Sequence, residues 1–172
     1  MAKASTDIHP GVAARPPTRL RSGGHAPLDE VARRIIRELQ RDGRRTYATI
    51  GEAVGLSEAA VRARVQRLRE DGLVQIVAVT DPMQLGFTRL AMIGVRTNGD
   101  LGPIADELAA FDDIDYLVLT AGSFDLLAEV ICRDDDHLLD LVQRIRAVAG
   151  VRTTEAFVYL KLCKETYNWG TR

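Results

Sequence analysis

Arginine and glutamine side chains recur at helical spacing in the segment EAAVRARVQRLRE, residues 58–70. At about 100° per residue, small residues and long hydrogen-bond donors share one face of such a helix. Alanines allow close approach to a neighbouring molecule, while Arg and Gln reach base edges and phosphates. This pattern suits a helix placed in the major groove of DNA. The candidate DNA-binding residues are Ser57, Ala59, Ala60, Arg62, Ala63, Arg64, Gln66 and Arg67.

Two helices joined by a tight turn would position these side chains. Residues 46–54 form the first helix, and Gly55 can adopt the left-handed conformation that ends it. Ser57 can cap the second helix, in which Val61, Val65 and Leu68 make one narrow apolar stripe. The pattern predicts a helix-turn-helix, and the strand-like run 73–77 follows it as in a winged arrangement.

The alternative is an ordinary helical hairpin whose arginine-rich face is merely solvated. The distribution of charge along the chain favours DNA binding over this alternative. Residues 1–27 carry four basic and one acidic side chain, residues 28–72 carry ten and eight, and residues 73–172 carry nine and fifteen, although the net charge of the chain is only −1. Of 23 basic residues 20 are Arg, the type that makes forked contacts to phosphate and guanine.

Composition narrows the class of protein further. The chain has 172 residues, 46% hydrophobic and 27% charged, as in a soluble globular protein. No apolar run is long enough for a membrane span and no signal peptide opens the chain, so we expect a cytoplasmic, nucleoid-associated protein without a membrane partner. Cysteines and histidines are scattered, so we predict no catalytic group, metal site or cofactor. They are Cys132, Cys163, His9, His25 and His137.

Pro and Gly residues, which interrupt helices and strands, help to divide the chain into five parts. We predict a disordered arm over 1–27, a three-helix DNA-binding domain over 28–74, a linking strand over 75–87, an α+β domain over 88–164 and a C-terminal tail over 165–172. The first helix of the DNA-binding domain spans residues 28–41. In the arm, Arg15, Arg19 and Arg21 either contact DNA or are simply solvated.

Residues 88–164 alternate strand and helix in the order βαββαβ, a ferredoxin-like unit. We predict strands at 88–97, 115–121, 124–133 and 154–164, and helices at 101–111 and 136–149. Both faces of the predicted sheet are apolar, although two helices can cover only one of them. An exposed apolar face of this size indicates association, so we expect at least a dimer.

The combination of LDEVARRIIRELQRDGR, VGLSEAAVRARVQRLREDG and a GSFD turn resembles the Lrp/AsnC group, the leucine-responsive or feast/famine transcriptional regulators. The resemblance covers residues 28–164. It implies a DNA-binding domain followed by a domain that dimerises and senses amino acids, with dimers assembling into tetramers or octamers. The implied partners are double-stranded DNA, further copies of the chain and a small-molecule effector, an amino acid.

The resemblance also implies an effector site near the strand–strand turn, where Gly122 and Asp125 match the family's Gly and Asp. The backbone at a glycine is accessible, and an aspartate supplies a carboxylate. Together they suit the charged groups of an α-amino acid. Two positions lack the hydroxyl that the family often carries, Ala121 and Ala156. The alternative is that Gly122 and Asp125 serve only to form the turn, since both residue types are common in turns. The candidate effector residues are Ala121, Gly122, Ser123, Phe124, Asp125, Thr154 and Ala156.

Two other functions fit the same two-domain plan. A siroheme-decarboxylase-like enzyme would need proton-handling residues such as His, and His137 alone lies within the predicted domains. An amino-acid-binding assembly without DNA function would leave the arginine-rich helix unexplained. We therefore predict a regulator that is not an enzyme.

Overall fold

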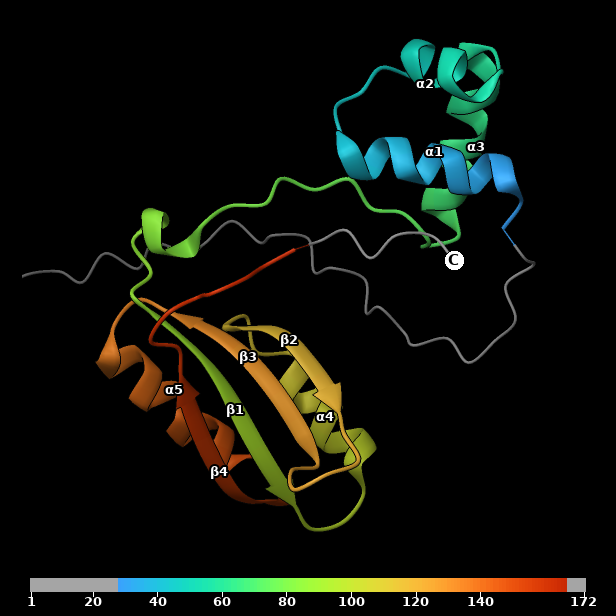
Figure 1. The fold of residues 1–172 in the computed structure, drawn as a ribbon. Coiled ribbons are helices and arrows are strands. Elements are labelled where there is room, and N and C mark those ends of the chain that lie inside the picture. The colour runs from blue at the N-terminus through green and yellow to red at the C-terminus, as the bar shows by residue number, and fades with distance from the viewer. Residues whose placement is uncertain (1–27, 167–172) are drawn as a thin grey trace, which may run out of the picture. The chain divides into compact units, whose positions relative to one another are not determined.

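The computed structural model describes residues 28–166 (Figure 1). Contacts between Cα atoms divide them into two compact units, one ending at Val77 and one spanning Ala78–Glu165. The predicted arm over 1–27 lies outside the described residues, as does the tail beyond residue 166. No helix of the described part is long and apolar enough to cross a membrane.

The first unit is a three-helix domain of α1 (Glu30–Arg41), α2 (Tyr47–Val54) and α3 (Glu58–Glu70). Each helix begins at a residue whose side-chain oxygen accepts a hydrogen bond from a backbone N–H in the first turn. These capping residues are Asp29, Thr46 and Ser57. The buried cluster between the helices comprises Ile35, Leu39, Ile50, Val54, Val61 and Val65.

The turn between α2 and α3 has the predicted chemistry. Gly55 has a φ of 77°, the left-handed conformation that ends α2. A Cβ atom at Gly51 would collide with the backbone carbonyl of Leu56, so a larger residue there would push the turn away from α2. Val61, Val65 and Leu68 are all buried, which confirms the predicted apolar stripe of α3.

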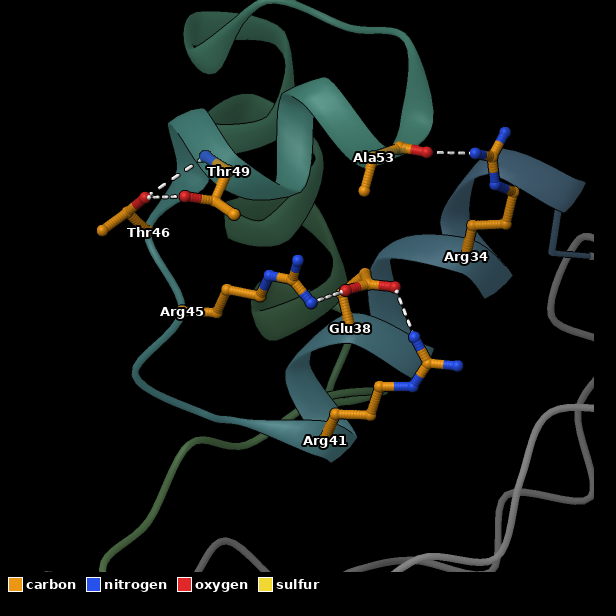
Figure 2. A network of polar contacts seen from close by, with 7 residues as sticks. All are labelled: Arg34, Glu38, Arg41, Arg45, Thr46, Thr49 and Ala53. Carbon is orange, nitrogen blue, oxygen red and sulfur yellow. Dashed lines mark hydrogen bonds and ion pairs between the residues drawn. The ribbon is translucent and has the colours of Figure 1, made fainter.

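Polar contacts also join α1 to the loop that follows it and to α2 (Figure 2). Glu38 accepts a hydrogen bond from Arg41 at 3.1 Å and another from Arg45. The Arg34 guanidinium donates to the backbone carbonyl of Ala53, which lies in the last turn of α2. The Arg34 contact supplements the apolar cluster in fixing α2, the helix on which α3 packs.

The segment after α3 differs from the prediction. Residues 73–81 have neither helix nor strand, and Pro82–Leu85 form a short 3-10 helix, η1, capped by Asp81. Val74 packs against the helical cluster, but Val77 is 68% exposed. A strand needs a partner for its backbone hydrogen bonds, and none of the described residues pairs with this segment. The predicted linking strand is therefore not formed within a single chain.

The second unit has the predicted βαββαβ order. Its elements are β1 (Arg89–Thr97), α4 (Leu101–Ala109), β2 (Ile114–Leu119), β3 (Leu126–Cys132), α5 (Asp135–Ala147) and β4 (Val151–Val158). The strands form one antiparallel sheet in the order β2-β3-β1-β4. Both helices lie against the same face of this sheet (Figure 1). This arrangement confirms the ferredoxin-like prediction.

The last strand occupies different residues from those predicted. It begins at Val151, three residues earlier, because Gly150 makes a left-handed turn shortly after α5 ends at Ala147. It ends at Val158, and Tyr159 donates one further backbone hydrogen bond to Leu90. Beyond that point β1 offers no partner, since β1 begins at Arg89.

Candidate nucleic-acid interface and effector site

The outward face of α3 carries the predicted DNA-binding residues. Six of them are exposed, namely Ser57, Ala59, Arg62, Ala63, Gln66 and Arg67. Ala60 and Arg64 are half-buried. The exposed residues lie opposite the buried stripe of Val61, Val65 and Leu68. The structure therefore brings small residues and long donors together on one accessible helix face.

The long side chains of this face differ in how they are held. Arg62 Nη2 lies 2.5 Å from Glu58 Oε1, and the Arg62 guanidinium lies over the Tyr47 ring, 5.2 Å from its centroid. Gln66 donates to Glu70 at 2.8 Å. Arg67 forms no ion pair or side-chain hydrogen bond within residues 28–166. The free donors of Arg67 are available to an anion such as a phosphate.

Arg64 has a partner on another helix. Its Nη1 atom lies 2.6 Å from Oδ2 of Asp29, the capping residue of α1. The hydrogen bond from Arg64, with that from the Ala32 backbone N–H, lowers the pKa of Asp29 below its ordinary 3.8. In the free chain, Arg64 thus ties α3 to the start of α1 rather than extending from the outward face.

In the second unit, the predicted effector turn is held by its own hydrogen bonds. Oδ2 of Asp125 accepts from the Thr97 backbone N–H at 2.7 Å and from the Thr97 hydroxyl at 3.2 Å. The Thr120 hydroxyl donates to the Phe124 carbonyl at 2.5 Å. Ala121, Gly122 and Ser123 are exposed at the tip of the turn. Asp125 therefore has a clear local role, which leaves one carboxylate oxygen for a ligand.

Phe124 leaves the turn and lies across the sheet. Its ring covers Gly94, where a Cβ atom would come within 2.7 Å of the ring carbons. It makes an edge-to-face contact with Phe157, with ring centroids 5.9 Å apart, and the Arg96 guanidinium lies 5.1 Å from its centroid. Phe124 therefore belongs to the sheet face opposite the helices.

Thr154 and Ala156, the other two predicted effector residues, lie apart from the turn on the opposite face of the sheet from Phe124. They pair with Val95 and Ile93, whose side chains face the helices, and Arg146 of α5 donates to the Thr154 hydroxyl at 2.7 Å. Cross-strand partners share a sheet face. Strand β1 separates them from Asp125, about 10 Å away at the usual strand spacing. The structure thus brings together the turn residues but not Thr154 and Ala156.

The sheet face opposite the helices is largely apolar and is not covered within the second unit. We call it the open face. Phe157 is 44% exposed and Tyr116 48% exposed on it. Glu129 lies among the apolar residues and accepts a hydrogen bond from Tyr159 at 2.8 Å. The remaining apolar members, all half-buried, are Leu90, Met92, Val118, Leu127 and Ile131.

Sequence reasoning missed two residues that hold side chains of the predicted DNA-binding set, Tyr47 and Asp29. Asp29 carries a readable capping signal before α1, but its pairing with Arg64 joins residues 35 positions apart. Tyr47 is the first residue of α2, and nothing in the sequence indicates that it contacts Arg62. Among residues 28–166, no group of three His, Cys, Asp or Glu side chains is arranged to hold a metal ion.

Comparison with known proteins gives matches over both units. Residues 28–69 match an AsnC-type helix-turn-helix domain, and residues 87–172 match a C-terminal dimeric alpha+beta barrel domain. The chain is 32% identical over 142 residues to the HTH-type transcriptional regulator FL11 of Pyrococcus horikoshii, covering 81% of this chain and 94% of that protein.

Solved structures of the same kind of regulator also match the chain over most of its length. The leucine response regulatory protein LrpA of Mycobacterium tuberculosis superposes with a TM-score of 0.75 at 30% identity, covering 80% of this chain and 96% of that one. A feast or famine regulatory protein of the same organism, complexed with L-methionine, superposes with a TM-score of 0.75 at 28% identity, covering 82% and 97%.

Proposed function

The chain belongs to the Lrp/AsnC family of transcriptional regulators, and on that premise we propose that it reads double-stranded DNA through the outward face of α3. The observation that carries the proposal is the exposed row of Ala59, Ala63 and Gln66, flanked by Arg62 and Arg67. Small residues let the helix backbone approach the floor of the major groove, and the long donors reach bases and phosphates from there.

The acidic neighbours of this row do not prevent DNA binding. Glu58 and Glu70 hold Arg62 and Gln66 in the free chain. Exposed ion pairs are worth roughly 0–1 kcal/mol, because water screens them and both side chains lose freedom. A good bidentate contact to a base adds about 1–3 kcal/mol of discrimination against the wrong base. An ion pair as weak as that between Glu58 and Arg62 therefore leaves Arg62 able to exchange its acidic partner for a base edge.

We propose further that the protein acts as a dimer, with tetramers or octamers built from it. The open face supports this, because burying its apolar side chains against a second copy removes them from water and stabilises the dimer. The exposed residues 75–80 support it too, because their backbone groups can form a ladder with the same segment of another copy. Two-fold pairing would present two α3 helices to one operator.

We propose an amino acid as the effector, as in the methionine-bound relative. The exposed turn 121–123 and the second carboxylate oxygen of Asp125 would hold its charged groups. Because β1 separates this turn from Thr154 and Ala156, one chain does not complete a pocket that includes all of them. Another copy would supply the remaining wall, so that effector binding and assembly are linked.

An enzymatic role is disfavoured by the surroundings of His137, the one histidine within residues 28–166. Its Nδ1 accepts from the Arg133 backbone N–H at 3.2 Å, and its Nε2 lies 3.2 Å from Asp113. Both ring nitrogens are thus engaged in structural contacts. We propose a cytoplasmic, nucleoid-associated regulator that is not an enzyme.

Selection of binding sites from a randomised duplex DNA library tests the DNA-binding function. A dimer that reads DNA through α3 should enrich a pseudo-palindrome whose half-sites are about 10 base pairs, or a multiple, apart. The expected spacing follows from placing two recognition helices on one side of the duplex. A library that remains unenriched at low salt would contradict the proposal.

A further inference from the structure

Arg62 is the one long donor of the α3 face that is held from two directions. Glu58 lies one turn earlier, so the acidic residue precedes the basic one in the favourable i,i+4 order. The Tyr47 ring belongs to α2 and covers a flat side of the guanidinium, with Cζ 5.2 Å from the ring centroid. A contact within α3 and a contact from α2 therefore fix the same side chain.

The two contacts leave Arg62 most of its hydrogen-bonding capacity. A guanidinium has five N–H donors in a planar fork, and Glu58 takes one of them through Nη2. The Tyr47 contact uses the π face and no donor. The side chain remains 62% exposed. Arg62 thus offers a free edge in a restricted orientation, as recognition of guanine O6 and N7 requires.

The other long side chains of this face lack that arrangement. Gln66 has a single partner, Glu70, on its own helix. Arg67 has no ion pair or side-chain hydrogen bond within residues 28–166, so no such contact restricts the direction in which its guanidinium meets a phosphate. Restricted and unrestricted arginines on one helix face suit base recognition and phosphate contact respectively.

We propose that Tyr47 is a positioning residue, which together with Glu58 orients Arg62 so that Arg62 reads one base pair in each half-site, while Arg67 supplies affinity that is independent of sequence. The inference rests on the proposed DNA-binding function and assigns the source of its specificity. It also assigns α2 a role in sequence recognition, through a residue that need not touch a base.

A purely structural role for Tyr47 makes a different prediction. Tyr47 also packs against the core of the three helices. If it served only to hold α2 on α3, its loss would weaken binding to all sequences by the same factor. If it positions Arg62, its loss changes the preference at one base pair and leaves affinity for random-sequence DNA as it was. Base preference therefore separates the two roles.

The experiment compares the full-length chain with its Tyr47→Leu, Tyr47→Phe, Glu58→Gln, Arg62→Ala and Arg67→Ala variants. Sites are selected from a randomised duplex library, and dissociation constants are then measured for the selected duplex, for its single-base-pair variants and for a random-sequence duplex. Leu keeps an apolar side chain against the core, and Phe keeps the aromatic ring. Thermal unfolding verifies that each variant is folded.

Arg62→Ala should reduce discrimination at one base pair by about fivefold or more. Tyr47→Leu should reduce it at the same base pair by about two- to fivefold, the size expected for loss of an exposed cation–π contact. Glu58→Gln should act at that base pair too, whereas Tyr47→Phe should retain discrimination. Arg67→Ala should weaken binding to all duplexes alike.

Unchanged base preference in Tyr47→Leu and Glu58→Gln would overturn the inference while leaving DNA binding intact. A uniform loss of affinity in Tyr47→Leu would do the same and assign Tyr47 a structural role. If Tyr47→Leu does not fold, Glu58→Gln decides by the same criterion whether the contacts of Arg62 set its base preference. Failure of the wild-type chain to bind any duplex at low salt would instead overturn the DNA-binding function.

Discussion

Asp29 joins the start of α1 to the middle of α3 through Arg64. Oδ2 of Asp29 lies 2.6 Å from Arg64 Nη1, while Oδ1 accepts from the Ala32 backbone N–H at 2.6 Å. One carboxylate therefore caps α1 and fixes the helix that carries the predicted DNA-binding residues. The sequence suggests Arg64 as a DNA contact, but in the free chain its guanidinium is committed to α1.

The Asp29–Arg64 pair should make the stability of the three-helix unit depend on acidity. Asp29→Asn keeps a capping oxygen but loses the ion pair, and Asp29→Ala loses both, so melting temperatures should fall in the order wild type, Asn, Ala. Because Arg64 lowers the pKa of Asp29 below 3.8, the stabilisation is present above that value and is lost as pH falls through the lower, folded-state pKa.

Thermal unfolding of wild type and Asp29→Asn between neutral pH and about pH 3 measures this dependence. The difference in melting temperature between the two proteins should shrink at the acid end of the series. A difference that stays constant over the whole range would show that the ion pair contributes nothing to stability.

The contact between Gly94 and Phe124 yields a prediction about packing in the second unit. A Cβ atom at Gly94 would lie 2.7 Å from the Phe124 ring, so Gly94→Ala must displace the ring. Overpacking of this kind costs about 1–3 kcal/mol. Combining Gly94→Ala with Phe124→Ala should remove most of that cost, as a double-mutant cycle by chemical denaturation would reveal. Additive effects would mean that the ring moves aside freely.

Asp125 requires a conservative substitution if its part in effector binding is to be measured. Asp125→Ala leaves the Thr97 backbone N–H without its acceptor, which costs about 1–3 kcal/mol of stability in addition to any loss of binding. Asp125→Asn keeps an acceptor oxygen and removes the charge. Calorimetry should show weaker amino-acid binding by Asp125→Asn at nearly wild-type stability. Equal affinities would leave Asp125 as a turn residue only.

Features that depend on neighbouring residues could be read from the sequence. Ser57 caps α3 and Gly55 ends α2, as their residue types and positions predict. The βαββαβ order follows from such local signals, because hydrophobic periodicity distinguishes helix from strand. The resemblance to a known family then supplied the function of the two units.

Features that depend on distant residues could not be read in this way. The run 73–77 has strand-like composition, but a strand exists only where a partner completes its ladder. Tyr47 and Arg62 meet because α2 packs across α3, and Asp125 meets Thr97 because β1 ends beside the turn. The faces occupied by Phe124 and Thr154 follow from sheet register, which the sequence did not specify closely enough.

Assembly through the open face predicts a mass in solution of at least twice the 18.9 kDa of one chain. Leu127→Asp places a charge on the open face, where burial against a second copy would be costly. This variant should dissociate to monomers in light scattering at micromolar concentration. Leu139→Asp is the matched control, since Leu139 is 57% exposed on α5. Dissociation of both variants, or of neither, would contradict assembly through this face.

The most direct test of DNA binding through α3 is the salt dependence of affinity in Arg67→Ala. Fluorescence anisotropy with the selected duplex, over a range of salt concentrations, gives the slope of log affinity against log salt. Loss of one phosphate contact should make that slope shallower by about 0.9 for each subunit that contacts DNA. Arg133→Ala, an exposed arginine of the second unit, is the control and should leave the slope unchanged. Equal slopes for wild type and Arg67→Ala, with equal affinities, would contradict the account.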